Sequence, residues 1–538
     1  MGGGKMKWII SKPVSEMRNI ITYSEGSKER EQLVREINAI KTQTIDIPVV
    51  IGGEEIFTDD VVEIRSPHDH NLVLARAHLA GERELKKAIE VSLNSHEQWA
   101  ELDWYHRVSI FMKAAELLSG PERFKTIAAI MMNHSKNPFE AEIDLIELCD
   151  FYRFNAYYAN FIYEQQPDQE TGELNRLDYR PLEGFVCAIT PFNFFSIAGN
   201  LPSSPAMMGN TVIWKPATST IFSNYHIVRV LEKAGLPEGI INFVPFRSKN
   251  AHILLKNSNL AGIHFTGSYE TFIDIWKTVG ENIVNYKNFP KLVGETGGKD
   301  FIFVHKSAEI EEAGTSIIRG AFESQGQKCS AVSRVYVPES FWPDLRNFLV
   351  EKLSKIKYGP VDDFENFMGA VIDQSAYKRA VSYIEYAREH QDEYEFIYGG
   401  NFDDSKGWFI QPTVIKTSNP RGKLMVEEIF APIVTVYVYS DDDYEETLKL
   451  CENSTPFGLT GAIFSKDRYA IALAEKILRY AAGNFYINDK PTGAIVSRQP
   501  FGGARASGTN DKAGSWINLL RWITPRTIKE NLKQIKMP

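Results

Sequence analysis

Apolar residues recur with helical spacing over two long stretches in the first third of the chain, residues 82–118 and 139–163. Positions three and four apart share one face of an α-helix, so this spacing predicts amphipathic helices. Residues 28–41 are strongly charged, and we expect a solvated helix there. Residues 164–178 are polar and contain a proline and a glycine, which predicts a loop or an exposed hairpin arm.

After residue 184, short apolar runs alternate with stretches of helical character. Alternation at this spacing predicts a parallel α/β sheet with helices packed against it. The four runs predicted to be buried strands are residues 184–190, 211–216, 241–245 and 262–267, and the helical stretches between them are residues 219–234 and 248–257.

A second alternation of strands and helices follows Cys329. The run 334–340 predicts a strand, residues 341–357 a helix and residues 431–439 a buried strand. We expect another helix to open at Ser440, with its acidic first turn complementing the helix dipole. The end of the chain is glycine-rich and then basic, and its pattern predicts no core of its own.

Length and composition indicate an ordinary globular protein. The 538 residues suffice for two or three domains, and 43% hydrophobic with 24% charged residues excludes a disordered or collagen-like chain. A net charge of −9 disfavours nucleic acid and anionic membranes as partners, and no apolar run is long enough to span a bilayer. The first eight residues lack the apolar segment of a signal peptide, which predicts a cytoplasmic protein, with the mitochondrial matrix as the alternative.

The chain has four cysteines, and one of them stands in a chemically unusual segment. Cys149 falls in a helical stripe, Cys187 in an apolar strand and Cys451 near a helix end, as inert buried cysteines do. Cys329 instead follows Lys328 in a polar segment that contains glycine, and a neighbouring cation can lower the pKa of a thiol. Cys329 is therefore the candidate nucleophile.

A carboxylate in a glycine-rich turn is the second candidate. Glu295 lies among three glycines in the stretch 292–300, so it is placed by a turn rather than on a solvated helix, although an ordinary loop acid remains an equal interpretation. The eleven histidines show no metal-ligand spacing, and no metal is expected. Sequence motifs of serine hydrolases, zinc proteases, phosphate-binding loops and Rossmann dinucleotide sites are absent.

The motif ETGGK at 295–299, followed by Cys329 in GQKCSA, resembles the aldehyde dehydrogenase superfamily. PFNF, WKPA, FTGS, EEIFAP and PFGG match it in the same order, and the resemblance covers roughly residues 50–530. It implies an α/β fold of two parallel-sheet domains plus a β-arm for oligomerisation. The implied parts are an NAD-binding domain of residues 1–163 and 183–294, a catalytic domain of residues 295–490, and an arm and C-terminal tail of residues 164–182 and 500–538.

Three C-terminal segments, residues 481–489, 499–514 and 520–530, resemble the Δ1-pyrroline-5-carboxylate dehydrogenases within this superfamily. The resemblance implies NAD-dependent oxidation of L-glutamate γ-semialdehyde to L-glutamate, the second step of proline catabolism, by a homodimer or higher homo-oligomer. The alternatives are a dehydrogenase for another small aldehyde, a non-catalytic structural relative, and a cysteine hydrolase acting as an esterase.

The same resemblance implies the catalytic roles. Cys329 would attack the aldehyde to form a thiohemiacetal, and Glu295 would activate water to hydrolyse the later thioester. The side-chain amide of Asn193 and the backbone N–H of Cys329 would stabilise the oxyanion. Without the resemblance, Asn193 would be interpreted as a turn residue.

The resemblance also implies binding residues for the two ligands. Many NAD-specific members have an acid where this chain has Thr218, so NAD is expected but NADP is not excluded. The family usually has glycine where this chain has Ala431, a small change that leaves the implied role of Glu428 in place. The implied cofactor-binding residues are Thr190, Lys215, Gly267, Ser268, Glu428 and Phe430. The implied substrate-binding residues are Glu147 for the α-amino group, Ser330, Gly493 and Ala494 for the α-carboxylate, and Phe194 and Phe501 for the aliphatic chain. Without the resemblance, Glu147 would be interpreted as a surface acid, and Phe194 and Phe501 would be interpreted as core residues.

Overall fold

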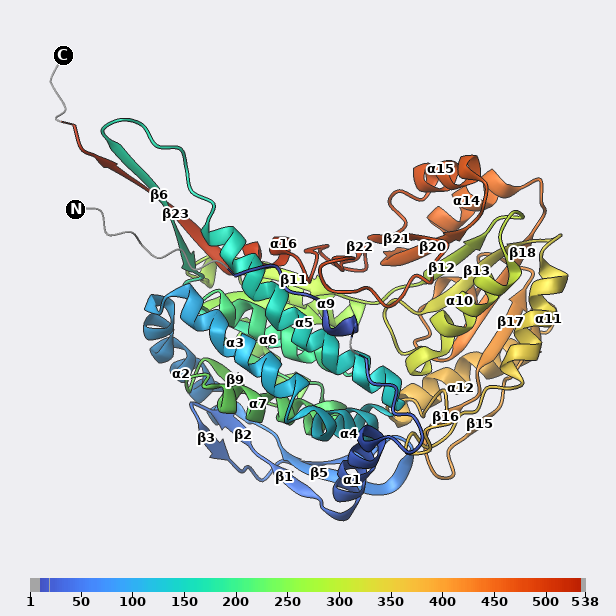
Figure 1. Cartoon of the computed structure of the whole chain (residues 1–538), viewed down its shortest axis with the longest axis horizontal. Helices are drawn as coiled ribbons and strands as arrows, with labels where there is room; N and C mark the ends of the chain where they lie inside the picture. Colours follow the sequence, from blue (N-terminus) through green and yellow to red (C-terminus); the bar gives the residue numbers. More distant parts are fainter. Residues whose placement is uncertain (1–9, 19, 534–538) are drawn as a thin grey trace.

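The computed structural model describes residues 10–18 and 20–533, and it is built around two seven-stranded sheets (Figure 1). The first eight residues, used above to predict the compartment, lie outside the described residues. None of the helices in the described part of the chain is long and apolar enough to cross a membrane.

The first sheet has the order β11-β10-β7-β8-β9-β2-β3. Its first five strands pair in parallel, and the edge strands β2 and β3 are antiparallel. All seven residues of β10 are buried, as expected for a parallel strand that is covered on both faces. The strands are β2 (Val49–Ile51), β3 (Glu54–Ile56), β7 (Phe185–Ile189), β8 (Thr211–Lys215), β9 (Ile241–Phe243), β10 (Leu260–Thr266) and β11 (Lys291–Glu295).

Alternate residues of this sheet enter two separate hydrophobic cores, because successive strand side chains point to opposite faces. Val186 and Ala188 of β7 pack in the core that contains the helices of one face, whereas Phe185 and Cys187 pack in the other. The first face is covered by α3 (Trp104–Ser119), α4 (Arg123–His134), α5 (Pro138–Tyr163), α6 (Phe195–Met207) and α7 (Ile221–Ala234), and the second by α2 (Glu82–Glu101), α8 (Ala251–Leu255) and α9 (Tyr269–Glu281).

The second sheet has the order β14-β17-β18-β13-β12-β20-β21, and only its edge strand β14 is antiparallel. Its strands are β12 (Asp300–Val304), β13 (Val332–Pro338), β14 (Tyr394–Tyr398), β17 (Thr413–Thr417), β18 (Ile433–Tyr439), β20 (Thr460–Phe464) and β21 (Asn484–Ile487). The helices packed on it are α10 (Ile310–Phe322), α11 (Trp342–Leu353), α12 (Gln374–Glu389), α14 (Tyr444–Asn453) and α15 (Arg468–Ile477).

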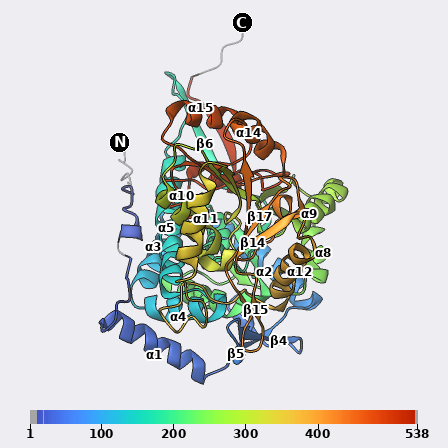
Figure 2. The same ribbon diagram turned by 90° about the vertical axis from the view of Figure 1, so that its right-hand side faces the viewer.

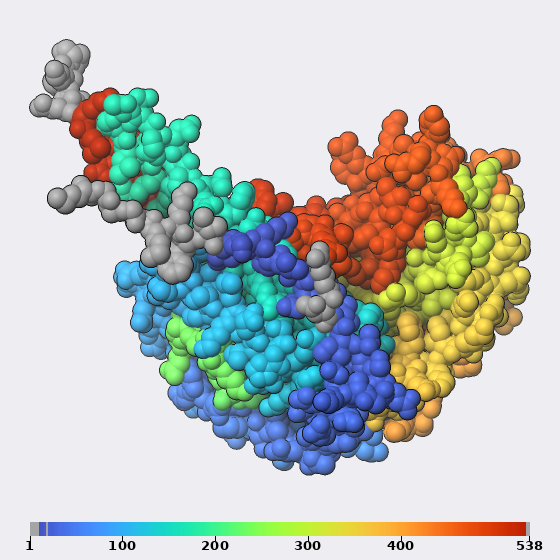
Figure 3. All heavy atoms as spheres, in the orientation of Figure 1, coloured from blue at the N-terminus to red at the C-terminus, as the bar shows by residue number. Residues whose placement is uncertain are grey.

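Two strands far apart in the sequence form an arm that projects from the body. Strand β6 (Glu173–Pro181) pairs along its whole length with β23 (Ile523–Asn531) in antiparallel register. The pair stays together in both orientations (Figures 1 and 2). The space-filling view shows a hollowed face between this arm and the region of α14 and α15 (Figure 3). Residues 164–172 therefore form a loop that leads into β6, and residues 173–178 belong to that strand of the arm.

A few elements differ from the sequence prediction. The stretch 82–118 is divided into α2 and α3 at residues 102–103, and α4 was not predicted. The helix expected to open at Ser440 begins at Tyr444, because Asp441 instead accepts a hydrogen bond from the backbone N–H of Ser340 and belongs to a turn. The predicted charged helix is α1 (Lys28–Thr42).

The remaining elements are short or peripheral. They include a three-stranded sheet, two small two-stranded sheets and two short helices. Their bounds are β1 (Ile45–Ile47), β4 (Val61–Ser66), β5 (Asp69–His78), β15 (Phe402–Asp403), β16 (Phe409–Ile410), β19 (Phe457–Gly458), β22 (Ala504–Arg505), α13 (Lys423–Val426) and α16 (Trp516–Leu519).

Candidate active site

Two cavities between the sheets meet at one cysteine. The first has a volume of about 300 Å³ and the second about 760 Å³, and Cys329, Phe265 and Thr266 line both. The other three cysteines line neither cavity, and all four are free and buried. Cys329 is thus the only thiol that could act on a ligand bound in either space. We call the smaller space the substrate cavity and the larger one the cofactor cavity.

The loop that carries Cys329 is held in a strained conformation between α10 and β13. Ser324 and Gln325 have positive φ angles of 52° and 59°, which non-glycine residues adopt only when their surroundings impose it. Contacts to α5 and to the turn that precedes it impose this conformation here. The backbone N–H of Ser324 donates to Glu140 at 2.5 Å, and the side-chain amide of Gln325 donates to the carbonyl of Ser135 at 2.6 Å.

The environment of the thiol differs from the sequence prediction. Burial, and then the charges of Asp300, Glu295 and Glu428, raise the pKa of Cys329 well above its usual value. Lys328 does not lower it, because its ammonium group turns away to bind Glu323 at 3.0 Å. The prediction of a thiol activated by its neighbouring lysine is therefore wrong, and attack by Cys329 requires a base to accept its proton.

Glu295 ends β11 and lines the substrate cavity together with Cys329. Its Oε2 accepts a hydrogen bond from the backbone N–H of Gly503 at 2.8 Å. Burial raises the pKa of Glu295 well above its usual value, although this hydrogen bond and the charge of Lys512 act in the opposite direction. A carboxylate with a raised pKa is a stronger base than a solvated one, as a general base requires.

Asn193 lies on the turn between β7 and α6 and is 7% exposed. It lines the cofactor cavity beside Cys329 and does not line the substrate cavity. The structure therefore brings it to the side of the thiol from which the cofactor would approach.

All six residues predicted to bind the cofactor line the cofactor cavity: Thr190, Lys215, Gly267, Ser268, Glu428 and Phe430. Parallel strands β7, β8 and β10 end at this edge of the first sheet, where ligands bind in open α/β sheets. Ser268 caps α9 by accepting a hydrogen bond from the N–H of Thr271, so the positive end of this helix faces the cavity and suits a pyrophosphate.

The loop after α13 supplies Glu428 and Phe430. The backbone N–H of Gly298 donates to Glu428 at 2.8 Å, and a Cβ atom at Gly297 would stand only 2.2 Å from the same carboxylate, so this close approach requires glycine. Burial raises the pKa of Glu428 to about 6. Phe430 has a φ of 60° and packs edge-on against Phe192.

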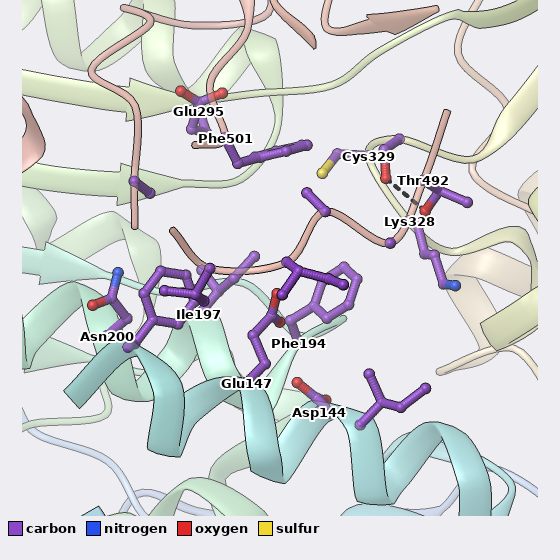
Figure 4. Close-up of a pocket in the computed structure, with 18 of the residues that line it drawn as sticks. Asp144, Glu147, Phe194, Ile197, Asn200, Glu295, Lys328, Cys329, Thr492 and Phe501 are labelled. Carbon is purple, nitrogen blue, oxygen red and sulfur yellow. Dashed lines mark hydrogen bonds between the residues drawn. The ribbon is translucent and has the colours of Figure 1, made fainter. Parts of the chain in front are cut away.

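All six residues predicted to bind the substrate line the substrate cavity: Glu147, Phe194, Ser330, Gly493, Ala494 and Phe501. Figure 4 shows Glu147 and Phe194 on one side of the cavity, with Cys329 and Phe501 on the other. Glu147 comes from α5 and accepts a hydrogen bond from the hydroxyl of Ser196 at 2.6 Å. Burial raises the pKa of Glu147 to about 7. The hydroxyl of Ser330 donates to Thr492 at 2.9 Å, beside Gly493.

Comparisons with known proteins agree with this arrangement. The model of the aldehyde dehydrogenase family matches residues 57–527. The chain belongs to the aldehyde dehydrogenase family. The resemblance found in the sequence and the predicted α/β fold are thereby confirmed.

Named relatives cover nearly the whole chain. A mitochondrial Δ1-pyrroline-5-carboxylate dehydrogenase of Dictyostelium discoideum is 50% identical, covering 97% of this chain and 94% of the relative. The mitochondrial enzyme of that name from Homo sapiens is 46% identical, covering 96% and 92%. A crystal structure of the Mycobacterium tuberculosis Δ-pyrroline-5-carboxylate dehydrogenase bound with NAD superimposes with a TM-score of 0.94, at 45% identity and 98% coverage of both chains.

Several residues that shape the aldehyde dehydrogenase site were not found by sequence reasoning. Asp144 on α5 accepts hydrogen bonds at 2.9 Å from the N–H groups of Phe195 and Ser196, so it caps α6 and holds Phe194 in place. Lys136 binds the same carboxylate at 2.6 Å and lies over the ring of Phe194. Lys490 also lines the substrate cavity. No local motif surrounds these residues, and only tertiary structure brings them together.

No group of three or more histidine, cysteine or acidic side chains within residues 10–18 and 20–533 is arranged to hold a metal ion.

Proposed function

We propose that this protein oxidises L-glutamate γ-semialdehyde, the open-chain form of Δ1-pyrroline-5-carboxylate, to L-glutamate with NAD as the oxidant. One observation carries the proposal: Cys329 lines both the substrate cavity and the cofactor cavity. The names of the relatives support the substrate, and the NAD-bound structure of a 45% identical protein supports the cofactor. The residues of the cofactor cavity fit a dinucleotide, with a helix N-terminus for the pyrophosphate and the carboxylate of Glu428 for a ribose.

The first step is addition of the Cys329 sulfur to the aldehyde carbon, which forms a thiohemiacetal. Because the thiol is protonated at rest, its proton must pass to a base as the C–S bond forms, and we assign this role to Glu295. The negative charge that develops on the aldehyde oxygen is stabilised by the amide of Asn193 and the N–H of Cys329.

Bound NAD would accept the hydride from the thiohemiacetal carbon. The chain's own residues then complete the reaction. The product of oxidation is a thioester of Cys329. Glu295 releases to solvent the proton that it took from the thiol, and it then removes a proton from the water that attacks the thioester. Cleavage of the C–S bond releases L-glutamate, and the proton held by Glu295 passes to the sulfur and restores the Cys329 thiol.

The charges in the substrate cavity distinguish this substrate from simple aldehydes. Glu147 offers an anion for an α-ammonium group, and Phe194 and Phe501 offer aromatic surfaces for the methylene groups. A non-catalytic relative would not need the three catalytic residues together, and an esterase would leave the cofactor cavity without a use.

Formation of L-glutamate tests the proposal. Purified protein should convert Δ1-pyrroline-5-carboxylate to L-glutamate when NAD is present, with one NADH formed per glutamate. No glutamate should form without a nicotinamide cofactor. NADH formed without glutamate, or glutamate formed without NAD, would contradict the proposed reaction.

We predict that the KM for glutamate semialdehyde falls about tenfold as the pH rises from about 6 to about 8. With a pKa of about 7, Glu147 is mostly neutral at the lower pH and attracts the substrate ammonium only once it is ionised. Steady-state kinetics, with KM expressed per open-chain aldehyde, measure the effect. The Glu147→Gln variant should lose the pH dependence. An unchanged slope in that variant would show that another group is responsible.

We propose that the two sheets are the cores of the cofactor and catalytic domains and that the β6–β23 arm joins two subunits. Leu174 and Leu532 are 43% and 66% exposed on this arm, and such apolar side chains are typical of an interface. The relatives named mitochondrial support the matrix rather than the cytoplasm as the compartment.

The arm proposal predicts that Leu174→Asp with Leu532→Asp weakens the homodimer at least about 100-fold, because two leucines that the proposed interface buries would be replaced by charges. Light scattering across a concentration series measures dissociation. Thr527→Asp adds a charge on an exposed arm position without removing an apolar contact, and it should dissociate far less. A double variant that stays as associated as the native protein would exclude the arm from the interface.

A further inference from the structure

Three cations share one buried carboxylate at the edge of the substrate cavity. Lys328 and Lys490 contact the same oxygen of Glu323 at 3.0 and 2.9 Å, and Arg319 contacts the other oxygen at 2.7 Å. All four residues line the cavity. The side chains of Glu323, Lys328 and Lys490 are only 8%, 10% and 20% exposed.

This cluster carries more positive than negative charge. Burial alone would raise the pKa of Glu323, but Lys328 and Lys490 lower it to about 2, so Glu323 contributes one full negative charge against three cations. The next acid is Glu140, whose pKa burial raises to about 7 and whose Oε2 has no hydrogen-bond partner, so it neutralises the cluster only in part. Buried cations without matching anions are costly, and an anionic ligand would complete the cluster.

The excess charge lies beside the backbone predicted to hold the substrate carboxylate. Lys490 begins the loop that continues to Gly493 and Ala494, and a Cβ atom built on Gly493 would stand 3.3 Å from the Lys490 Nζ atom. Gly493 has a φ of 85°, a conformation that leaves this position to glycine. An anion bound at Gly493 would therefore lie next to the ammonium group of Lys490.

By contrast, the other lysine of the cavity is already neutralised. Lys136 pairs with Asp144 alone at 2.6 Å, and both side chains are almost fully buried. The positive charge of Lys136 is therefore already balanced by Asp144 and is not available to a further anion.

We propose that Lys490 is a specificity-determining residue that selects aldehydes with a carboxylate at the end remote from the aldehyde group. This role rests on the proposed function, because it assumes that the aldehyde end of the substrate lies at Cys329. Lys328 belongs to the same cluster, but it adjoins the nucleophile, so its substitution would disturb the catalytic loop. Lys490 does not adjoin Cys329 in the sequence, so its substitution tests recognition of the substrate apart from the chemistry at the nucleophile.

The experiment compares two aldehydes that differ only at the remote end, 5-oxopentanoate with a carboxylate and pentanal with a methyl group. In Lys490→Met, the ratio of kcat/KM for 5-oxopentanoate to kcat/KM for pentanal should fall about 10- to 100-fold, mainly through KM. Lys490→Arg should restore most of the ratio. The control Lys355→Met removes a lysine that pairs with Glu351 on the surface, and it should keep the native ratio.

Three results are decisive. A ratio in Lys490→Met within about twofold of the native value would overturn the proposal, and so would an equal loss on both aldehydes through kcat, which a merely structural role produces. Failure of the proposed function is distinguishable, because the native enzyme would then show no preference for glutamate semialdehyde over pentanal before any substitution is made.

Discussion

The Cys329→Ser variant is expected to lose NADH formation from glutamate semialdehyde by about 10⁴-fold or more, because the variant lacks the nucleophile that starts the reaction. Serine differs from cysteine by one atom, and Cys329 is buried at 8% exposure, so the fold and the cofactor cavity should be retained. Binding of NAD, measured by calorimetry, should therefore stay within about threefold of the native value.

Cys451→Ser is the matched control for this experiment. Cys451 is also fully buried, but it packs in the core of the second sheet and lines neither cavity. Its substitution should lower the free energy of unfolding somewhat and leave the turnover rate within about twofold of the native rate. Turnover by Cys329→Ser within tenfold of the native rate would remove Cys329 from the mechanism.

The second large effect is expected from Glu295→Gln. The amide is similar in size to the carboxylate but accepts no proton, so both the attack of Cys329 and the hydrolysis of the thioester lose their base. We expect a loss of about 10² to 10⁴ in kcat. We expect hydrolysis to be slowed more than attack, so that a covalent glutamyl-enzyme accumulates.

Mass spectrometry of acid-quenched protein detects this intermediate. Native enzyme mixed with substrate and NAD should carry little adduct, whereas Glu295→Gln should carry a glutamyl group on the peptide that contains Cys329. The double variant with Cys329→Ser must carry none. Rapid turnover by Glu295→Gln, or an adduct on another residue, would contradict the assigned base.

The strands and long helices could be predicted because their buried residues follow a regular pattern along the sequence. Strand β10 is buried on both faces and appears in the sequence as a mostly apolar run, and α5 ends at Tyr163, where the predicted break in the pattern begins. Helix α4 was missed because nine of its twelve residues are buried, including polar ones, so it has no polar face to create a period. The start of α14 was misplaced because Asp441 serves a turn that pairs with Ser340, which lies 101 residues away in sequence.

Only some of the site residues could be predicted from the residues themselves, because the others are brought to the site only by tertiary structure. Cys329 and Glu295 stand in unusual local sequences, so the residues themselves pointed to them. Glu147 and Phe194 were assigned only through the resemblance, because their relation to Cys329 exists only in the folded chain. Lys490 was missed altogether. The pKa of Cys329 was predicted in the wrong direction because the sequence shows Lys328 beside the thiol but not that its ammonium group binds Glu323.

The most direct test of the account is the steady-state kcat/KM for glutamate semialdehyde, measured beside pentanal and with each nicotinamide cofactor. We predict that the semialdehyde is preferred at least about 100-fold, since both of its charged groups find partners in the cavity. We also predict that NAD is used better than NADP, although Thr218 provides no acid to repel a 2′-phosphate. A native enzyme that oxidises pentanal as well as glutamate semialdehyde would contradict the central claim.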